Sequence, residues 1–101
     1  MKGFFQREAK KGLEKDDRVV IVAVGKDKPG LIAGVTSIIS ELNGNIEDMD
    51  QVVLQEVFIM SLIVRFLNLE TKEKIERLMD MLNREGEKLG LKVHVYPLSR
   101  L

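Results

Sequence analysis

A stretch of regular alternation between Val57 and Phe66 constrains the fold of this chain more than any other segment. Every second position carries a large apolar side chain: Phe58, Met60, Leu62, Val64 and Phe66. A period of two places these side chains on one face of a β-strand, so we assign them to a core. The other face is too apolar for water to cover: Val57, Ile59, Ser61, Ile63 and Arg65. The strand therefore belongs to a sheet with one packed face and one largely aliphatic open face.

The segment before it predicts a strand, a tight loop and a helix. The β-branched run Val19–Val24, closed by Gly25, indicates a strand that is buried on both faces and is therefore central. After the turn residues 25–30, an apolar stripe at helical spacing predicts a helix: Leu31, Ile32, Val35, Ile38, Ile39 and Leu42. Pro29 suits the first helical turn, and Asn43-Gly44 is a suitable stop.

The remaining elements follow the same reasoning. Residues 45–54 predict a second strand, joined to the alternating strand by a two-residue turn at Gln55-Glu56 that lacks the usual glycine. Asn68 or Thr71 can cap a second helix. Its buried stripe consists of Ile75, Leu78, Met79, Leu82 and Leu89, and Gly90 ends it. A last strand alternates from Leu91 to Tyr96 and ends at Pro97.

The order β-α-β-β-α-β is that of the ferredoxin-like α+β fold, a four-stranded antiparallel sheet with two helices on one face. Val20 and Val22 would join the aliphatic side chains on the open face, which makes a larger patch than a soluble monomer usually exposes. Self-association as a homodimer explains this patch, and partial cover by residues 1–17 is the alternative. We treat residues 1–17 as an N-terminal extension and residues 18–101 as the domain. Phe5, Ala9 and Leu13 permit a short amphipathic helix or a frayed tail.

Composition narrows the possible functions. The chain of 101 residues has the length of one domain, and its 16 basic and 16 acidic residues cancel, so we predict neither nucleic-acid nor membrane binding. The absence of cysteine excludes disulfides, thiolate metal sites and a cysteine nucleophile. The N-terminus carries charges where a signal peptide needs an apolar stretch. We therefore expect a cytoplasmic protein.

The loop at residues 25–30 is the strongest candidate for chemistry. Backbone N–H groups at the start of a helix attract a carboxylate or a phosphate. Gly30 would let a ligand approach the backbone closely, and Asp27 could accept an ammonium group. The loop therefore has groups for both ends of an amino acid. From this segment alone, however, the simpler interpretation is that Asp27 and Pro29 only start a helix.

The residues 25–33, Gly-Lys-Asp-Lys-Pro-Gly-Leu-Ile-Ala, resemble the Asp-x-Pro-Gly signature that follows the first strand of ACT domains. The resemblance continues through Gly44-Asn45-Ile46, Asp48, Gln51, Phe58-x-Met60 and Leu89-Gly90-Leu91-x-Val93, and it covers about Arg18 to Leu98. The order of these pieces is more specific than any one of them. The chain is most similar to small stand-alone ACT proteins that resemble the amino-terminal half of glycine-cleavage repressors.

This resemblance implies a ligand site where the loop meets the start of the second strand, usually at a dimer interface. The residues that it implicates are Asp27, Pro29, Gly30, Leu31, Ile32, Asn45, Ile46 and Asp48. It implies a non-catalytic regulatory module that binds an amino acid or a related metabolite and signals to a protein partner. Unlike in larger ACT proteins, we expect no enzymatic or DNA-binding unit in this chain for the domain to regulate.

Other chemistries find less support. His94 is the only histidine, and Asp48 and Asp50 share a strand face, but we predict no metal, no cofactor and no catalytic residue. A structural dimerisation adaptor without a ligand is one alternative. An acylphosphatase-like enzyme of the same fold is another, although its loop arginine is missing here. RNA-recognition domains of this fold carry aromatic residues on the open face, where this chain carries aliphatic ones.

Overall fold

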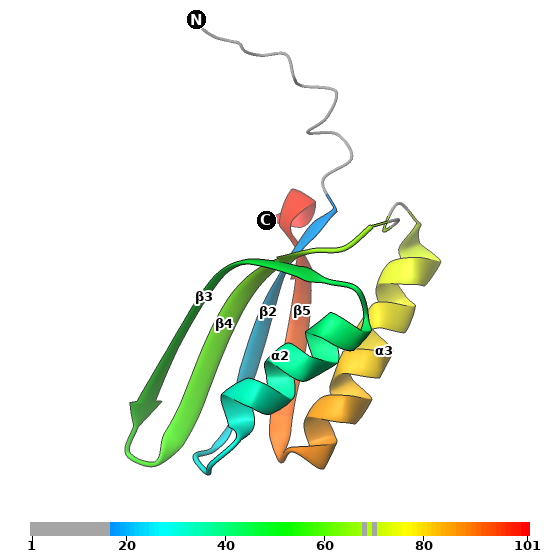
Figure 1. The fold of residues 1–101 in the computed structure, drawn as a ribbon. Coiled ribbons are helices and arrows are strands. Elements are labelled where there is room, and N and C mark those ends of the chain that lie inside the picture. The colour runs from blue at the N-terminus through cyan, green and yellow to red at the C-terminus, as the bar shows by residue number, and fades with distance from the viewer. Residues whose placement is uncertain (1–16, 68, 70) are drawn as a thin grey trace, which may run out of the picture.

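The two helices lie side by side on one face of a single sheet and leave the other face uncovered (Figure 1). The computed structural model describes residues 17–67, 69 and 71–101, so the predicted extension helix at Phe5, Ala9 and Leu13 lies outside the described residues. The elements, in chain order, are β2 (Arg18–Lys26), α2 (Leu31–Glu41), β3 (Asn45–Leu54), β4 (Val57–Arg65), α3 (Lys72–Lys88), β5 (Leu91–Pro97) and the 3-10 turn η1 (Leu98–Arg100).

The sheet has the strand order β3-β4-β2-β5, and every neighbouring pair is antiparallel. This arrangement confirms the predicted ferredoxin-like α+β fold. β2 pairs with β4 on one side and β5 on the other, so the prediction that it is central is also confirmed. β3 and β5 are left as the two edges of the sheet.

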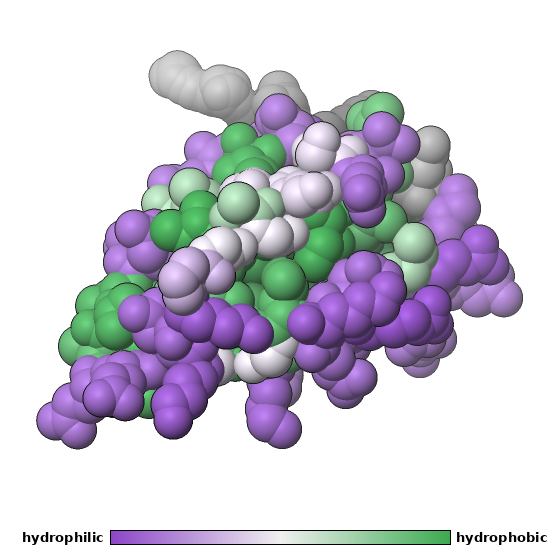
Figure 2. Space-filling view, turned by 60° about the horizontal axis from the view of Figure 1, so that its bottom comes forward, coloured by the Kyte–Doolittle hydropathy of each residue, from purple (hydrophilic) through white to green (hydrophobic). Residues whose placement is uncertain are grey.

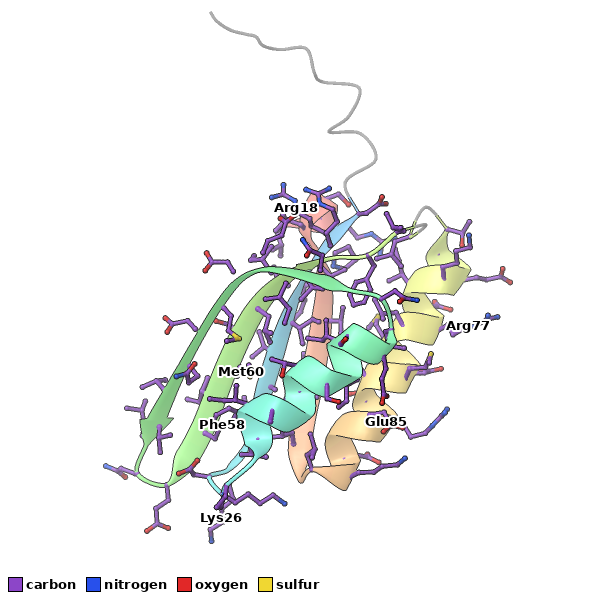
Figure 3. All side chains as sticks on the ribbon, viewed as in Figure 1. Arg18, Lys26, Phe58, Met60, Arg77 and Glu85 are labelled. Carbon is purple, nitrogen blue, oxygen red and sulfur yellow. The ribbon has the colours of Figure 1, made fainter. Side chains whose placement is uncertain are left out.

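The core lies between the sheet and the helices, as the alternation in β4 predicts. The side chains of Phe58, Met60, Leu62 and Val64 are at most 3% exposed, and Figure 3 shows Phe58 and Met60 between β4 and α2. Facing them are residues of α2 and α3 that are also buried: Leu31, Val35, Ile39, Leu78 and Leu82. Burial of each such side chain contributes about 1.5–3 kcal/mol to folding. This apolar layer is therefore the main source of stability.

The two helices differ in what they present to solvent. The exposed side of α2 is small and almost uncharged, whereas charged side chains cover the exposed side of α3 (Figure 2). Arg77 on α3, for example, points away from the sheet (Figure 3). Within the described part of the chain, neither α2 nor α3 is long and apolar enough to cross a membrane.

The turn chemistry agrees with the sequence, and one strand boundary differs. Gln55 and Glu56 both adopt positive φ angles, 49° and 72°, which a two-residue hairpin turn requires even though neither is glycine. Thr71 is the cap of α3, because its hydroxyl accepts a hydrogen bond from the Lys74 N–H at 3.2 Å; Asn68, the other predicted cap, is outside the described residues. β4 ends at Arg65, one residue before the predicted Phe66.

A bulge near the start of β3 is a feature that the sequence did not reveal. The pairing of β3 with β4 shifts between Ile46 and Asp48, so Glu47 is the extra residue. The carboxylate of Glu47 lies 2.7 Å from the Arg65 Nε and 4.0 Å from an Arg18 nitrogen. Exposed ion pairs contribute only about 0.2–1 kcal/mol each. The pairs therefore orient this end of the sheet rather than stabilise the fold.

Gly25 offers a test of the close contact between the end of β2 and the α3–β5 connection. A Cβ at this position would lie 2.5 Å from the Gly90 carbonyl oxygen and 2.8 Å from Leu91 Cδ2. We expect Gly25→Ala to lower the free energy of unfolding by about 1–3 kcal/mol, measured by urea denaturation, because backbone has to move.

Gly34→Ala is the matched control. Its Cβ would meet only the flexible end of Leu89, at 2.8 Å, and alanine favours the helix over glycine by about 1 kcal/mol. We expect a change below about 1 kcal/mol. Equal losses in the two variants would contradict this account of Gly25.

Candidate functional site

The loop between β2 and α2 is tied to the hairpin between β3 and β4. The backbone N–H of Asp27 donates a hydrogen bond of 2.9 Å to the Glu56 carbonyl oxygen. This bond holds the loop against the far end of β3, although loop and hairpin are about 30 residues apart in the sequence. The Asp27 side chain stays exposed, so its carboxylate remains accessible to a ligand.

The start of α2 leaves its first N–H groups without a side-chain acceptor. Gly30 is the N-cap with a φ of 88°, a conformation that glycine adopts without strain. Among the described residues, α2 has neither a side-chain hydrogen bond at its cap nor an acidic residue in its first turn. Pro29 lies in the turn before the helix, which corrects our prediction that it occupies the first helical turn. Uncapped N–H groups and the helix dipole favour an anion here.

An open hollow lies between this loop, the first turn of α2 and β3, and we call it the loop hollow. Its lining consists of Asp27, Lys28, Gly30, Leu31, Ile32, Gln51, Val53 and Phe58. Asp27 and Lys28 supply charge, and Gln51 supplies an amide that can donate and accept. Ile32 and Val53, exposed by 38% and 46%, give the hollow an apolar wall. It therefore offers an anion position, a cation position and an apolar surface within one space.

The structure divides the predicted site residues into two groups. Asp27, Gly30, Leu31 and Ile32 line the loop hollow, and Pro29 shapes the turn that leads to them. Asn45, Ile46 and Asp48 are not among its lining residues, because they lie near the opposite end of β3.

Gln51 and Val53 are the two lining residues of β3 that were not among the predicted site residues. They pair with Met60 and Phe58 of β4, so their side chains face the helices, on the same side of the sheet as the loop. Their period of two was visible in the sequence. Their closeness to Asp27 was not, because it depends on the hydrogen bond from the loop to Glu56.

Asp48 and Asp50 face the open side of the sheet, opposite Ile63 and Ser61. The Asp48 carboxylate accepts a hydrogen bond of 2.9 Å from the Met49 N–H, and that of Asp50 accepts one of 2.9 Å from the Gln51 N–H. They therefore satisfy backbone donors of the edge strand. In the described part of the chain, no group of three or more histidine, aspartate and glutamate side chains could hold a metal ion.

The family profile of ACT domains matches residues 17–96, which is most of the chain. The chain belongs to the ACT domain family. A UPF0237 protein of Methanopyrus kandleri is 38% identical over 78 residues, covering 77% of this ACT domain chain and 84% of that protein.

Solved structures agree with this assignment. An ACT domain protein from Streptococcus pneumoniae superposes with a TM-score of 0.68 at 36% identity, covering 77% of this chain and 85% of the other. A putative glycine cleavage system transcriptional repressor gives a TM-score of 0.64 at 23% identity, covering 77% of this chain and 43% of that one. The second likeness shows the shared fold. Together they confirm the resemblance that the sequence motifs indicated.

Gly30 tests whether the left-handed turn holds the loop hollow in shape. A Cβ added at Gly30 would have no atom within 4 Å, so backbone strain alone should oppose an alanine. We expect Gly30→Ala to lower the free energy of unfolding by about 1–2 kcal/mol in urea denaturation.

Asp27→Ala serves as the comparison in the same loop. We expect a change within about 0.5 kcal/mol, because the exposed Asp27 side chain can be removed while its backbone hydrogen bond to Glu56 remains. A neutral Gly30→Ala would show that the turn does not need the left-handed conformation. A large loss in Asp27→Ala would give its carboxylate a structural role.

Proposed function

We propose that this ACT domain is a non-catalytic regulatory module that binds a small amino acid or a related metabolite in the loop hollow. It acts as a homodimer and signals to a protein partner whether the hollow holds a ligand. The observation that carries this proposal is the pairing of the Asp27 carboxylate with the uncapped start of α2 in one hollow. The proposal includes a cytoplasmic location, which is consistent with the lack of cysteine.

Each group of an α-amino acid has a complementary partner in the loop hollow. The ligand carboxylate accepts hydrogen bonds from the N–H groups at the start of α2, where the helix dipole is positive. The ligand ammonium donates to the Asp27 carboxylate, and the Gln51 amide can bind either end. A short side chain packs against Ile32 and Val53. Because the hollow is open, it suits small ligands better than large ones.

A ligand in the loop hollow would connect three parts of the chain: the loop, the first turn of α2 and the edge strand β3. It shifts an equilibrium only through a difference in affinity between two states. Here the difference lies in how closely the loop and β3 approach each other. A partner protein that contacts this end of the sheet would detect that change.

Asn45, Ile46 and Asp48 contribute to the ligand site only if two copies pair through their β3 edges. If two β3 edges pair in antiparallel fashion, the start of one β3 lies beside the loop hollow of the other copy. If the two open faces stack, each hollow is formed within one chain. Ligand binding by Asn45→Ala and Gln51→Ala variants separates the two arrangements. Loss in Asn45→Ala supports edge pairing, and loss in Gln51→Ala alone supports stacking.

A thermal-shift screen against the twenty amino acids, with glycine and serine included, tests the proposal directly. Ligand at about a hundred times its dissociation constant adds about 2.7 kcal/mol of stability. We expect at least one amino acid to raise the Tm of the wild-type protein. We expect Asp27→Ala to abolish this shift, because the ammonium loses its acceptor.

Asp80→Ala is the control, since Asp80 is an exposed carboxylate on α3, away from the loop hollow. It should respond to ligand as the wild type does. A flat screen at millimolar concentrations would contradict amino-acid sensing and would favour the alternative of a dimerisation adaptor without a ligand.

A further inference from the structure

The open face of the sheet is a regular grid that the strand registers define. One row across it reads Asp50, Ser61, Val22, His94, because these residues are successive pairing partners on β3, β4, β2 and β5. The row on one side reads Asp48, Ile63, Val20, Tyr96, and the row on the other reads Val52, Ile59, Val24, Lys92. In the part of the chain that the structure describes, no element lies on this face (Figure 1).

Charge on this grid is arranged by column. The two central columns, on β4 and β2, are aliphatic apart from Ser61 in these three rows. The β3 column carries two carboxylates, from Asp48 and Asp50. The β5 column carries one charge, the Lys92 ammonium, and the polar imidazole of His94 beside it. The face is therefore an apolar strip with an acidic edge on one side and a basic edge on the other.

We propose that this face binds the same face of a second copy, with the two-fold axis parallel to the strands. Such an axis puts the β3 column of one copy opposite the β5 column of the other. Asp50 of each copy then faces His94 and Lys92 of the other copy, so the same contact forms at both edges of the interface. The aliphatic columns meet between these edges. The proposal rests on the homodimer of the proposed function and names its interface.

The other two-fold arrangements lack this complementarity. An axis across the strands places the acidic column on the acidic column of the partner. Pairing through the β3 edge brings Asp48 and Asp50 of two copies together, and opposed like charges on paired strands are destabilising. The carboxylates of Asp48 and Asp50 also accept hydrogen bonds from the Met49 and Gln51 N–H groups, which a pairing strand would otherwise use. The central part of the β3 edge is thus protected against strand pairing.

The face is large enough for a small dimer interface. Four strands about 4.8 Å apart and about seven residues long cover roughly 450 Å² in projection. Because side chains corrugate the surface, its accessible area is larger than this projection; a standard interface buries about 800 Å² per partner. At one end of the face, Glu47 pairs with Arg65 at 2.7 Å and lies 4.0 Å from Arg18 within each copy. This carboxylate reduces the repulsion between the arginines of two stacked copies.

Charge reversal at the two edges is the decisive experiment, with the dimer dissociation constant measured by sedimentation equilibrium of the full chain. We expect Asp50→Lys and Lys92→Glu each to weaken the dimer by about tenfold or more, because each opposes like charges. Combined in one chain, they should restore it to within about threefold, because the two substituted positions exchange sign and again attract each other across the interface. A double variant weaker than either single one would overturn the proposal.

A cross-link locates the interface independently, since the chain has no cysteine. Ser61→Cys lies in a central column, so a short bismaleimide should join two copies through it. Ser37→Cys, exposed on α2, should remain unlinked. A monomeric wild type, or a dimer that the Ser61→Cys variant does not link, would overturn the stacking. If the variant is a monomer and its cysteine does not react with maleimide, residues 1–16 cover the face instead.

The two proposals can fail separately. A monomer whose Tm still rises with an amino acid would refute only this interface. A cross-linked dimer with a flat thermal-shift screen would refute only the ligand.

Discussion

The pairing of β2 with β4 and β5 is the constraint on which the rest of the structure depends. It aligns the alternation in the three strands, so Ile21, Met60 and Val95 all point toward the helices while Val22, Ser61 and His94 point the other way. A shift of one residue in either pairing would exchange the two faces and expose the core. The same registers place the loop after β2 beside the hairpin that ends β3. Stability, the loop hollow and the open face are thus consequences of one set of hydrogen bonds.

The two candidate surfaces use different physics because they lie on opposite sides of β3. On the helix side, Gln51 and Val53 meet an uncapped helix start, where a small charged ligand can replace hydrogen bonds to water. On the open side, Asp48 and Asp50 border a strip of aliphatic side chains that only a second extended surface can cover. In the dimer that we propose, β3 connects the ligand to the interface. A ligand that held β3 against the loop would also alter the strand that forms the acidic edge of that dimer.

The sequence predicted the fold well because its strongest signals are local. The period of two in Phe58–Val64 and the helical stripes determine which faces are buried, and these fix the layers. The site was predicted only in part. Asp27, Gly30, Leu31 and Ile32 belong to one continuous loop and helix start, so their proximity follows from the sequence itself. The contribution of Gln51 and Val53 from β3 depends on the hydrogen bond from Asp27 to Glu56, which has no residue signature.

The central claim is that the loop hollow binds an amino acid, and backbone amide NMR tests it most directly. In a titration of the full chain with glycine, serine and the other amino acids at millimolar concentration, the account predicts shifts for the amides of residues 27–33 and of Gln51 and Val53. The amides of α3 and of η1 should stay in place at the same concentrations. Shifts confined to other parts of the chain, or no shifts with any of the twenty amino acids, would contradict the account.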